Sequence, residues 1–549
     1  MSLMGSFWVG VSGLQTSNNA LNTTAHNMSN LDTKGYTRQQ VAQGTRSYTT
    51  IYKGRPNWQQ IGRGVNYTLT RQERDIFLDK NYRRESGRSA FYDVSATAME
   101  EIEYILGEAQ GGGSIEGHEF SESLTNLWVA VQELSKDPTS SVNQNLFVTR
   151  SYEFVTKASA VYTSLCQYQD NLNKSIIQEV NNINSYAQEI EYLNERIVAI
   201  EAGQEHANDL RDRRNYLLDE LGKLANISFT EDITGYMSVR LEDIDLVKGG
   251  LVNTIDLYTD PTTGFYTPYW RMLARASYDE DGNRIVTKEG IESARVFDLT
   301  RTVSSDLNTD VGSLKSMLLA RGDHRATYRD LKNINMDGEY EANWYDRNIS
   351  QSVVMNIQAE FDQLINAVVT KINDILAWEA DRVDPNNEDG YLRDADGNPL
   401  QLFKLLNQNG DWTVSNITIN QELRQNPSLL KFRMSEHSED YPVMDKLREA
   451  FTERIYTLNP NVQTPLAFTD YYTNLVSQVA NSGSVMRGVQ ATQTVATDAL
   501  LNAREQVVGV SSDEELTNMI RYQNAYNASS RYINVVSEML EHILTTLGR

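Results

Sequence analysis

The sequence predicts a multidomain α+β fold with a terminal α-helical coiled coil, a discontinuous rod built as a bundle of long helices, and β-rich inserted domains. Three observations lead to this prediction. Apolar residues recur at steps of three and four at both ends of the chain, and the same spacing runs through a very long central segment. Short alternating stretches, bounded by glycines, interrupt the helical pattern.

The first helix is predicted within residues 1–31, a segment that contains no Asp, Glu, Lys or Arg. Its longest apolar run is Phe7-Trp8-Val9, far short of the ~20 residues that cross a bilayer. The segment also lacks the positive start and continuous apolar middle of a cleaved signal peptide. Instead it carries a stripe with heptad spacing, in which the polar Asn18 is expected to fix the register: Phe7, Val11, Leu14, Asn18, Leu21, Ala25 and Met28.

The last helix is predicted from Ser512, where Ser512 and Glu515 form a capping-box pattern. A second stripe follows it to the end of the chain: Leu516, Met519, Gln523, Tyr526, Ser530, Ile533, Ser537, Leu540, Leu544 and Leu547. Neither terminal helix can bury its stripe alone, because isolated helices are marginal in water. We therefore expect the two to pair, with packing of each on the central body as the alternative.

Between the ends, the longest helical pattern runs from about residue 142 to 201, a length typical of coiled coils and bundles. Further helices are predicted near 75–107, 121–134, 208–224, 312–320, 350–379 and 468–508. Short antiparallel strands are predicted from 226 to 302. The predicted domains are paired terminal helices (1–40 and 512–549), a discontinuous helical rod (41–225, 303–380 and 466–511), a β-rich insertion (226–302) and a second, mixed insertion (381–465).

Composition argues against several classes of function. The 50 Lys and Arg face 74 Asp and Glu, a net charge of −24, which argues against a general nucleic-acid binder. A single cysteine, Cys166, excludes an intramolecular disulfide and a thiolate zinc site. The six histidines fall in unrelated segments, and no nucleophile-elbow motif occurs. We therefore predict no enzyme, and no catalytic, cofactor-binding or metal-binding residues.

One motif identifies a family. Residues 26–39 read His-Asn-Met-Ser-Asn-Leu-Asp-Thr-Lys-Gly-Tyr-Thr-Arg-Gln, which resembles the Asn-x-x-Asn-x-x-Thr-x-Gly-Tyr signature of the bacterial flagellar rod, hook and hook-associated axial proteins. Lys34 stands where proline is commoner. Residues 513–528 resemble the closing helix of the same family. The Tyr36-Thr37-Arg38-Gln39 variant and the chain length favour its hook-associated branch, as do resemblances at 208–214, 312–318 and 416–420.

The resemblance implies a structural component of the bacterial flagellum, a ring of subunits that adapts the flexible hook to the filament. The implied partners are the chain itself, the hook protein, the adjoining hook-associated protein on the filament side, and an export chaperone that binds the C-terminal helix. The implied location is outside the cell, reached through the flagellar type III export route without membrane insertion.

The resemblance also assigns two sets of residues. Those expected to pair the terminal helices in an inner tube are Phe7, Val11, Leu14, Asn18, Leu21 and Met28, with Leu516, Met519, Gln523, Tyr526, Ile533, Leu540 and Leu544. Those expected to shape the turn after the first helix are Asn27, Asn30, Thr33, Gly35 and Tyr36.

Two other interpretations stay open. Another axial protein, such as the hook or distal rod protein, would share the termini but not the long helix at 142–201. An adhesin or enzyme carried by an insertion would instead place its activity in residues 226–305 or 380–465.

Overall fold

The computed structural model describes residues 3–53, 58–107, 116–203, 205–278, 284–382, 392–394, 397–435, 438–439 and 441–547. The chain divides into two compact units, each built from segments far apart in the sequence. Unit 1 comprises residues 1–89, 181–254 and 493–549. Unit 2 comprises residues 90–180 and 255–492.

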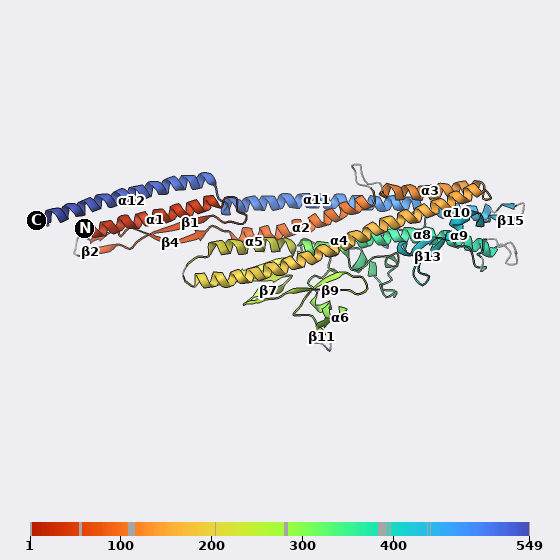
Figure 1. The fold of residues 1–549 in the computed structure, drawn as a ribbon, viewed down its shortest axis with the longest axis horizontal. Helices are drawn as coiled ribbons and strands as arrows, with labels where there is room; N and C mark the ends of the chain where they lie inside the picture. The colour runs from red at the N-terminus through yellow and green to blue at the C-terminus, as the bar shows by residue number, and fades with distance from the viewer. Residues whose placement is uncertain are drawn as a thin grey trace. The chain divides into compact units, whose positions relative to one another are not determined.

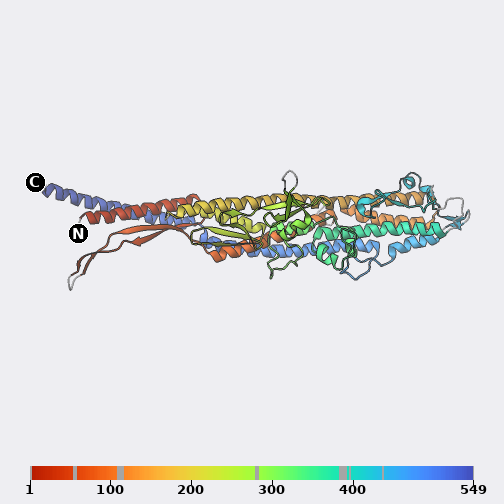
Figure 2. The ribbon, with the colours of Figure 1, turned by 90° about the horizontal axis from the view of Figure 1, so that it is seen from below.

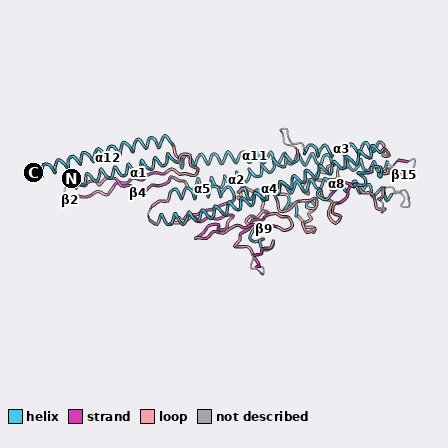
Figure 3. Tube along the Cα trace, viewed as in Figure 1, coloured by secondary structure: helices cyan, strands magenta, loops and turns pink. Residues whose placement is uncertain are grey.

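Long helices account for most of the described structure, as Figure 3 shows in cyan. The predicted α+β fold class, with its terminal helices and long-helix bundle, is confirmed. The helices are α1 (Leu3–Ser29), α2 (Ile76–Ile105), α3 (Glu116–Lys136), α4 (Ser141–Glu201), α5 (Asn208–Leu224), α6 (Lys288–Ile291), α7 (Ser313–Arg321), α8 (Val353–Arg382), α9 (Gln421–Gln425), α10 (Tyr441–Thr452), α11 (Phe468–Val508) and α12 (Ser512–Leu547).

The strands of unit 1 form antiparallel pairs. β1 (Gln39–Thr45) pairs with β4 (Val65–Gln72), and β2 (Thr49–Lys53) pairs with β3 (Trp58–Ile61), so that the second pair is nested between the strands of the first in the chain. A four-stranded sheet has the order β5 (Ile227–Glu231), β6 (Met237–Leu241), β7 (Ile244–Lys248), β8 (Leu251–Val252).

Unit 2 contains four two-stranded antiparallel pairs among its described residues. They are β9 (Ile255–Thr259) with β10 (Tyr266–Trp270), β11 (Ala276–Tyr278) with β12 (Arg284–Val286), β13 (Phe403–Leu405) with β14 (Ile417–Ile419), and β15 (Arg433–Ser435) with β16 (Ser438–Glu439). The strands predicted within 226–302 are present, with β5–β8 in unit 1 and β9–β12 in unit 2. The two units are coarser than the four predicted domains, whose boundaries stay a prediction.

The core of unit 2 lies where α3, α4, α8, α10 and α11 meet. Phe120 packs against Phe361 and Tyr472 with ring centroids 4.9 and 4.7 Å apart, within the range of favourable edge-to-face contacts. Two carboxyl groups of α8, Glu360 and Asp362, are also fully buried.

The core of unit 1 is centred on α5, whose Leu217, Leu218 and Leu221 are buried. Beside them runs a buried network of ion pairs. Arg83 Nε lies 2.6 Å from Asp219 Oδ1, and Arg504 Nη2 lies 2.7 Å from Asp219 Oδ2. The carboxylate of Asp219 therefore joins α2, α5 and α11 within this unit.

Candidate functional site at the paired terminal helices

Helices α1 and α12 lie side by side in unit 1 and run antiparallel, so that both chain ends lie at the same end of the pair (Figures 1 and 2). A Cβ placed on Gly10 would lie 2.7 Å from Ile533 Cγ1, and one on Gly13 would lie 2.8 Å from Ser529 Oγ. A side chain at Gly10 would require Ile533 to shift, whereas the Ser529 hydroxyl could rotate away from one at Gly13. The glycines of α1 thus permit the close approach.

Within this chain, α1 does not bury the stripe that was predicted. Its buried face is small and hydroxylated, and it includes Ser12, Thr16, Ala20 and Thr24. Such side chains satisfy their own hydrogen bonds, as Thr16 Oγ1 does by donating to the Ser12 carbonyl at 2.8 Å, and they leave room for strands β1 and β4. Phe7, Val11, Leu14, Leu21 and Met28 are only half-buried and Asn18 is exposed, so Asn18 is not a buried polar residue of an intrachain seam.

The stripe of α12 is likewise left largely uncovered. Leu516 is 50 % exposed and Leu544 is 74 % exposed. Gln523 is exposed, and four further predicted positions are half-buried: Met519, Tyr526, Ile533 and Leu540. Val536, which was not predicted, is buried. The intrachain pairing of the terminal helices therefore leaves apolar surface on both.

The turn that follows α1 is organised by Asn27, which is 1 % exposed. Asn27 Nδ2 donates to the Gln39 carbonyl at 2.9 Å, and Asn27 Oδ1 accepts from the Gln39 amide at 3.1 Å and from the Tyr36 hydroxyl at 2.7 Å. Burial and the nearby carboxylates raise the pKa of Tyr36 well above its usual value, so this hydroxyl stays a donor. Asn27 closes the turn by holding its two ends together.

The other signature residues have more local roles. Asn30 Nδ2 donates to the His26 carbonyl at 3.0 Å, and Thr33 Oγ1 donates to Asn30 Oδ1 at 3.2 Å. Gly35 has a φ of +81°, and a Cβ there would lie 2.9 Å from Tyr216 Cβ. Both the left-handed backbone and the close approach to α5 favour glycine at this position.

Four side chains outside the predicted set of turn residues tie the turn to its surroundings: Asp212, Arg38, Glu514 and Glu515. Asp212 Oδ2 accepts from the Thr37 amide at 3.1 Å. Arg38 Nε donates to Glu515 Oε1 at 2.8 Å, and Arg38 Nη1 lies 2.8 Å from Glu514 Oε2. The turn is thereby bound to α5 and to the first turn of α12.

The predicted capping box of Ser512 and Glu515 is wrong, because Glu515 binds Arg38 instead. Helix α12 does begin at Ser512, but Ser511 Oγ accepts a long bond of 3.5 Å from the Glu514 amide. Glu515 is buried and committed to Arg38. A carboxylate that binds a partner 477 residues away in the sequence can be mistaken for a local cap, because the local pattern is the same in both cases.

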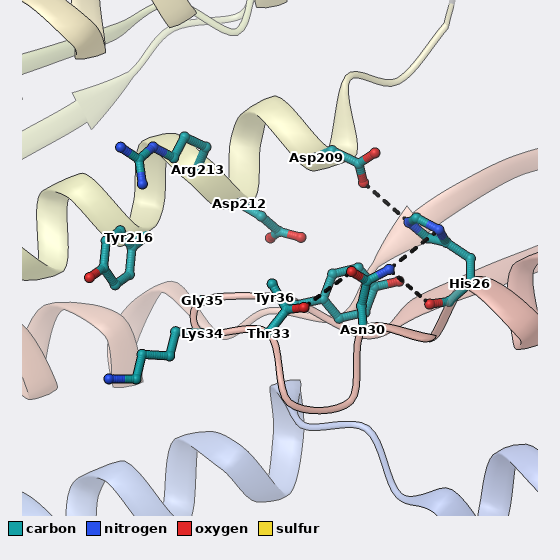
Figure 4. Close-up of a pocket in the computed structure, with 10 residues that line it drawn as sticks. All are labelled: His26, Asn30, Thr33, Lys34, Gly35, Tyr36, Asp209, Asp212, Arg213 and Tyr216. Atoms are coloured by element: carbon teal, nitrogen blue, oxygen red, sulfur yellow. Dashed lines mark hydrogen bonds and ion pairs between the residues drawn. The ribbon is translucent and has the colours of Figure 1, made fainter. Parts of the chain in front are cut away.

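A pocket of about 510 Å³ lies between this turn and α5 (Figure 4). Its lining residues carry both signs of charge, because Lys34 and Arg213 are basic and Asp209 and Asp212 are acidic. Burial raises the pKa of Asp212 to about 6. The side chains of the pocket offer hydrogen bonds and charge. In the described ranges of the chain, no group of three His, Cys, Asp or Glu is placed to hold a metal ion.

Replacing Asn27 with alanine is expected to destabilise the turn by about 2 kcal/mol, because the partly buried amide and carbonyl of Gln39 and the Tyr36 hydroxyl lose their partner. Amide hydrogen exchange in residues 36–41 should accelerate accordingly. Asn30→Ala is the matched control, since the bonds of Asn30 are exposed and their loss should cost less than about 0.5 kcal/mol. Equal acceleration in both variants would contradict the role given to Asn27.

Comparisons with known proteins agree with this architecture. Residues 99–386, just over half of the chain, match the family described as the flagellar hook-associated protein FlgK helical domain. Residues 7–37 match the flagella basal body rod protein family, and residues 506–546 match the C-terminal region of the flagellar basal body rod FlgEFG proteins. The latter two matches cover α1 with its turn and most of α12.

The chain is similar over nearly its whole length to proteins named flagellar hook-associated protein 1. It is 26 % identical to that of Bacillus subtilis, with 96 % of this chain and 95 % of the relative covered. It is 23 % identical to that of Salmonella typhimurium and 22 % identical to that of Escherichia coli, with 97 % and 98 % covered in both comparisons.

A solved structure supports the fold. The flagellar hook junction protein FlgK from Burkholderia pseudomallei aligns with a TM-score of 0.54 at 11 % identity, and the alignment covers 79 % of this chain and all of that one. Together with the match across the helical domain, these comparisons confirm the flagellar resemblance of the signature turn, and the chain belongs to the flagellar hook-associated protein FlgK family.

Proposed function

We propose that copies of this chain form a ring at the junction between hook and filament, and that the role is mechanical. The observation that carries the proposal is the apolar surface left uncovered on the paired terminal helices. In addition to Leu516 and Leu544, Trp8 of α1 is 61 % exposed. Exposed apolar surface of this kind is characteristic of protein interfaces. The predicted stripe residues would serve contacts between copies better than contacts within one chain.

The contacts on either side of the ring follow from the same proposal. One side would meet the hook protein and the other the adjoining hook-associated protein of the filament side. Before assembly, the exposed apolar residues of α12 have to be shielded from water, and an export chaperone bound to this helix would shield them. Export would follow the flagellar type III route. None of the helices in the described part of the chain combines the length and the apolar composition that a membrane crossing requires.

Deletion of the gene that encodes this chain tests the proposed role at the junction between hook and filament. Electron microscopy of the deleted cells is expected to show bare hooks, and an assay of the medium is expected to find filament protein, because export works while the adaptor is missing. Cells that keep intact filaments would refute the proposal. Cells without hooks would favour a rod or hook subunit instead.

A pair of substitutions tests the uncovered stripe. Leu544→Glu places a charge on the stripe at an exposed position, so the chain should still fold while filaments are lost. Thr545→Glu is the matched control, because Thr545 is also exposed but lies one residue off the stripe. Circular dichroism of both purified variants reports folding, and electron microscopy reports assembly. Filament loss in both variants, or in neither, would contradict the assignment of the stripe.

A further inference from the structure

The charge of the chain is unevenly distributed between its two units. Unit 2 contains 48 Asp and Glu against 27 Lys and Arg, whereas unit 1 contains 26 against 23. Nearly all of the net charge of −24 therefore belongs to unit 2. Surfaces of one sign steer partners of the other sign and repel one another, so an acidic unit 2 needs a basic partner wherever copies meet closely.

Unit 1 contains a segment of the opposite sign. Residues 33–53 and 58–72, here called the basic hairpin, comprise the end of the signature turn and strands β1–β4, and they carry six Lys and Arg with no Asp or Glu. Arg46 and Arg63 are exposed and lie close together, because the Arg46 amide donates to the Gly64 carbonyl at 3.0 Å. Neither forms an ion pair with another described residue. Tyr48, beside them, is 62 % exposed.

Unit 2 offers a matching surface on α2. The exposed residues Asp93, Thr97, Glu100, Glu101 and Tyr104 follow the i, i+4, i+7, i+8, i+11 spacing of one helix face, and we call them the acidic stripe. Its three carboxylates form no ion pair with any described residue. Many acids elsewhere in unit 2 are neutralised, as Glu133 is by Lys136 and Asp470 by Arg454.

We propose that the basic hairpin of one copy docks on the acidic stripe of a second copy of this chain. Arg46 and Arg63 would face Glu100 and Glu101, and Tyr48 would pack beside Tyr104. The arrangement relieves the repulsion between acidic units, and it supplies opposite charges to Arg46, Arg63, Glu100 and Glu101, none of which forms an ion pair with a described residue of its own chain. Since arginine binds carboxylates through a planar fork of donors, it suits such a contact better than lysine. This contact rests on the proposed self-assembly.

Charge-reversed variants in flagellated cells test the contact. Two double variants are compared: Arg46→Glu with Arg63→Glu, and Glu100→Lys with Glu101→Lys. Each should weaken the attachment of the filament to the hook, so that shear releases filaments several-fold more readily than from unaltered cells. A chain carrying all four substitutions restores complementarity between copies and should recover retention. Asp445→Lys with Glu449→Lys is the matched control, because these exposed acids lie on α10, away from the stripe.

Photocrosslinking supplies a second readout that does not depend on filament retention. Benzoylphenylalanine in place of Tyr48 should give a dimer of the chain, with the adduct mapped to residues 93–104 of the second copy. Adducts only with another protein or another segment, no adduct at all, or no rescue by the fourfold variant would overturn the contact. If gene deletion still sheds filament protein while these tests fail, the contact is wrong and the junction role stands.

Discussion

Replacing Asp219 with alanine is expected to lower the free energy of unfolding of unit 1 by about 3–5 kcal/mol, the usual cost of leaving buried charges without their partner. Asp219 binds two guanidinium groups, those of Arg83 and Arg504. Arg83 is only 2 % exposed, so water cannot replace the lost carboxylate. Burial alone would raise the pKa of Asp219, but the two arginines outweigh it and hold that pKa below its usual value.

The measurement is amide hydrogen exchange along α5, since a chain of two units does not unfold as one. Protection of residues 208–224 should fall by roughly two orders of magnitude or more. Glu220→Ala is the matched control, because its ion pair with Lys223 spans one turn of the helix and is partly exposed, and its loss should cost less than about 1 kcal/mol. Similar loss of protection in both variants would show that the network does not hold α5.

Unit 2 is expected to become less stable as the pH rises from about 4.5 to 7, because of Glu360. Burial raises the pKa of Glu360 to about 7, with side-chain amides of Asn356, Asn459 and Gln478 as its partners. Over this range the unfolded chain has released its proton while the folded chain still holds it, so the folded state binds more protons and stability falls with pH. The contribution of this one carboxyl is about 3 kcal/mol. Burial raises the pKa of Asp362 to about 7 as well, and its contribution has the same sign.

Glu360→Gln isolates the effect. The variant should match the original chain near pH 4.5 and exceed its stability by about 3 kcal/mol at pH 8. Urea unfolding followed by tryptophan fluorescence suits the test, since five of the seven tryptophans lie in unit 2. The control is Asp374→Asn on the same helix, an exposed position that should leave the pH profile unchanged. A constant difference between Glu360→Gln and the original chain at every pH would contradict the assignment.

The long helices could be predicted from the sequence because their apolar period is local. The pattern of α4 predicted residues 142–201 for a helix that spans Ser141–Glu201. The sequence predicted which residues shape the turn, but it did not predict which of them contributes most to holding it. Asn27 and Asn30 look alike in the sequence, yet only Asn27 is fully buried and bonded across the turn.

Contacts between distant segments lay beyond sequence reasoning. Arg83 and Asp219 are 136 residues apart, and nothing in the neighbourhood of either marks the other. The buried face of α1 was misjudged because apolar periodicity was taken as the measure of burial. The small residues Ser12 and Thr16 lie outside the predicted stripe, yet both are buried, and Ser12 packs closely against Gly64.

The antiparallel pairing of α1 and α12 also sets an order in time. A ribosome makes Gly10 more than five hundred residues before Ile533, the residue against which Gly10 packs. Unit 2 has all of its segments once residue 492 has been made, whereas unit 1 lacks one of its three segments until residues 493–549 have been made. Helix α1 is therefore synthesised long before the helix with which it pairs, and it stays unpaired until α12 has been translated.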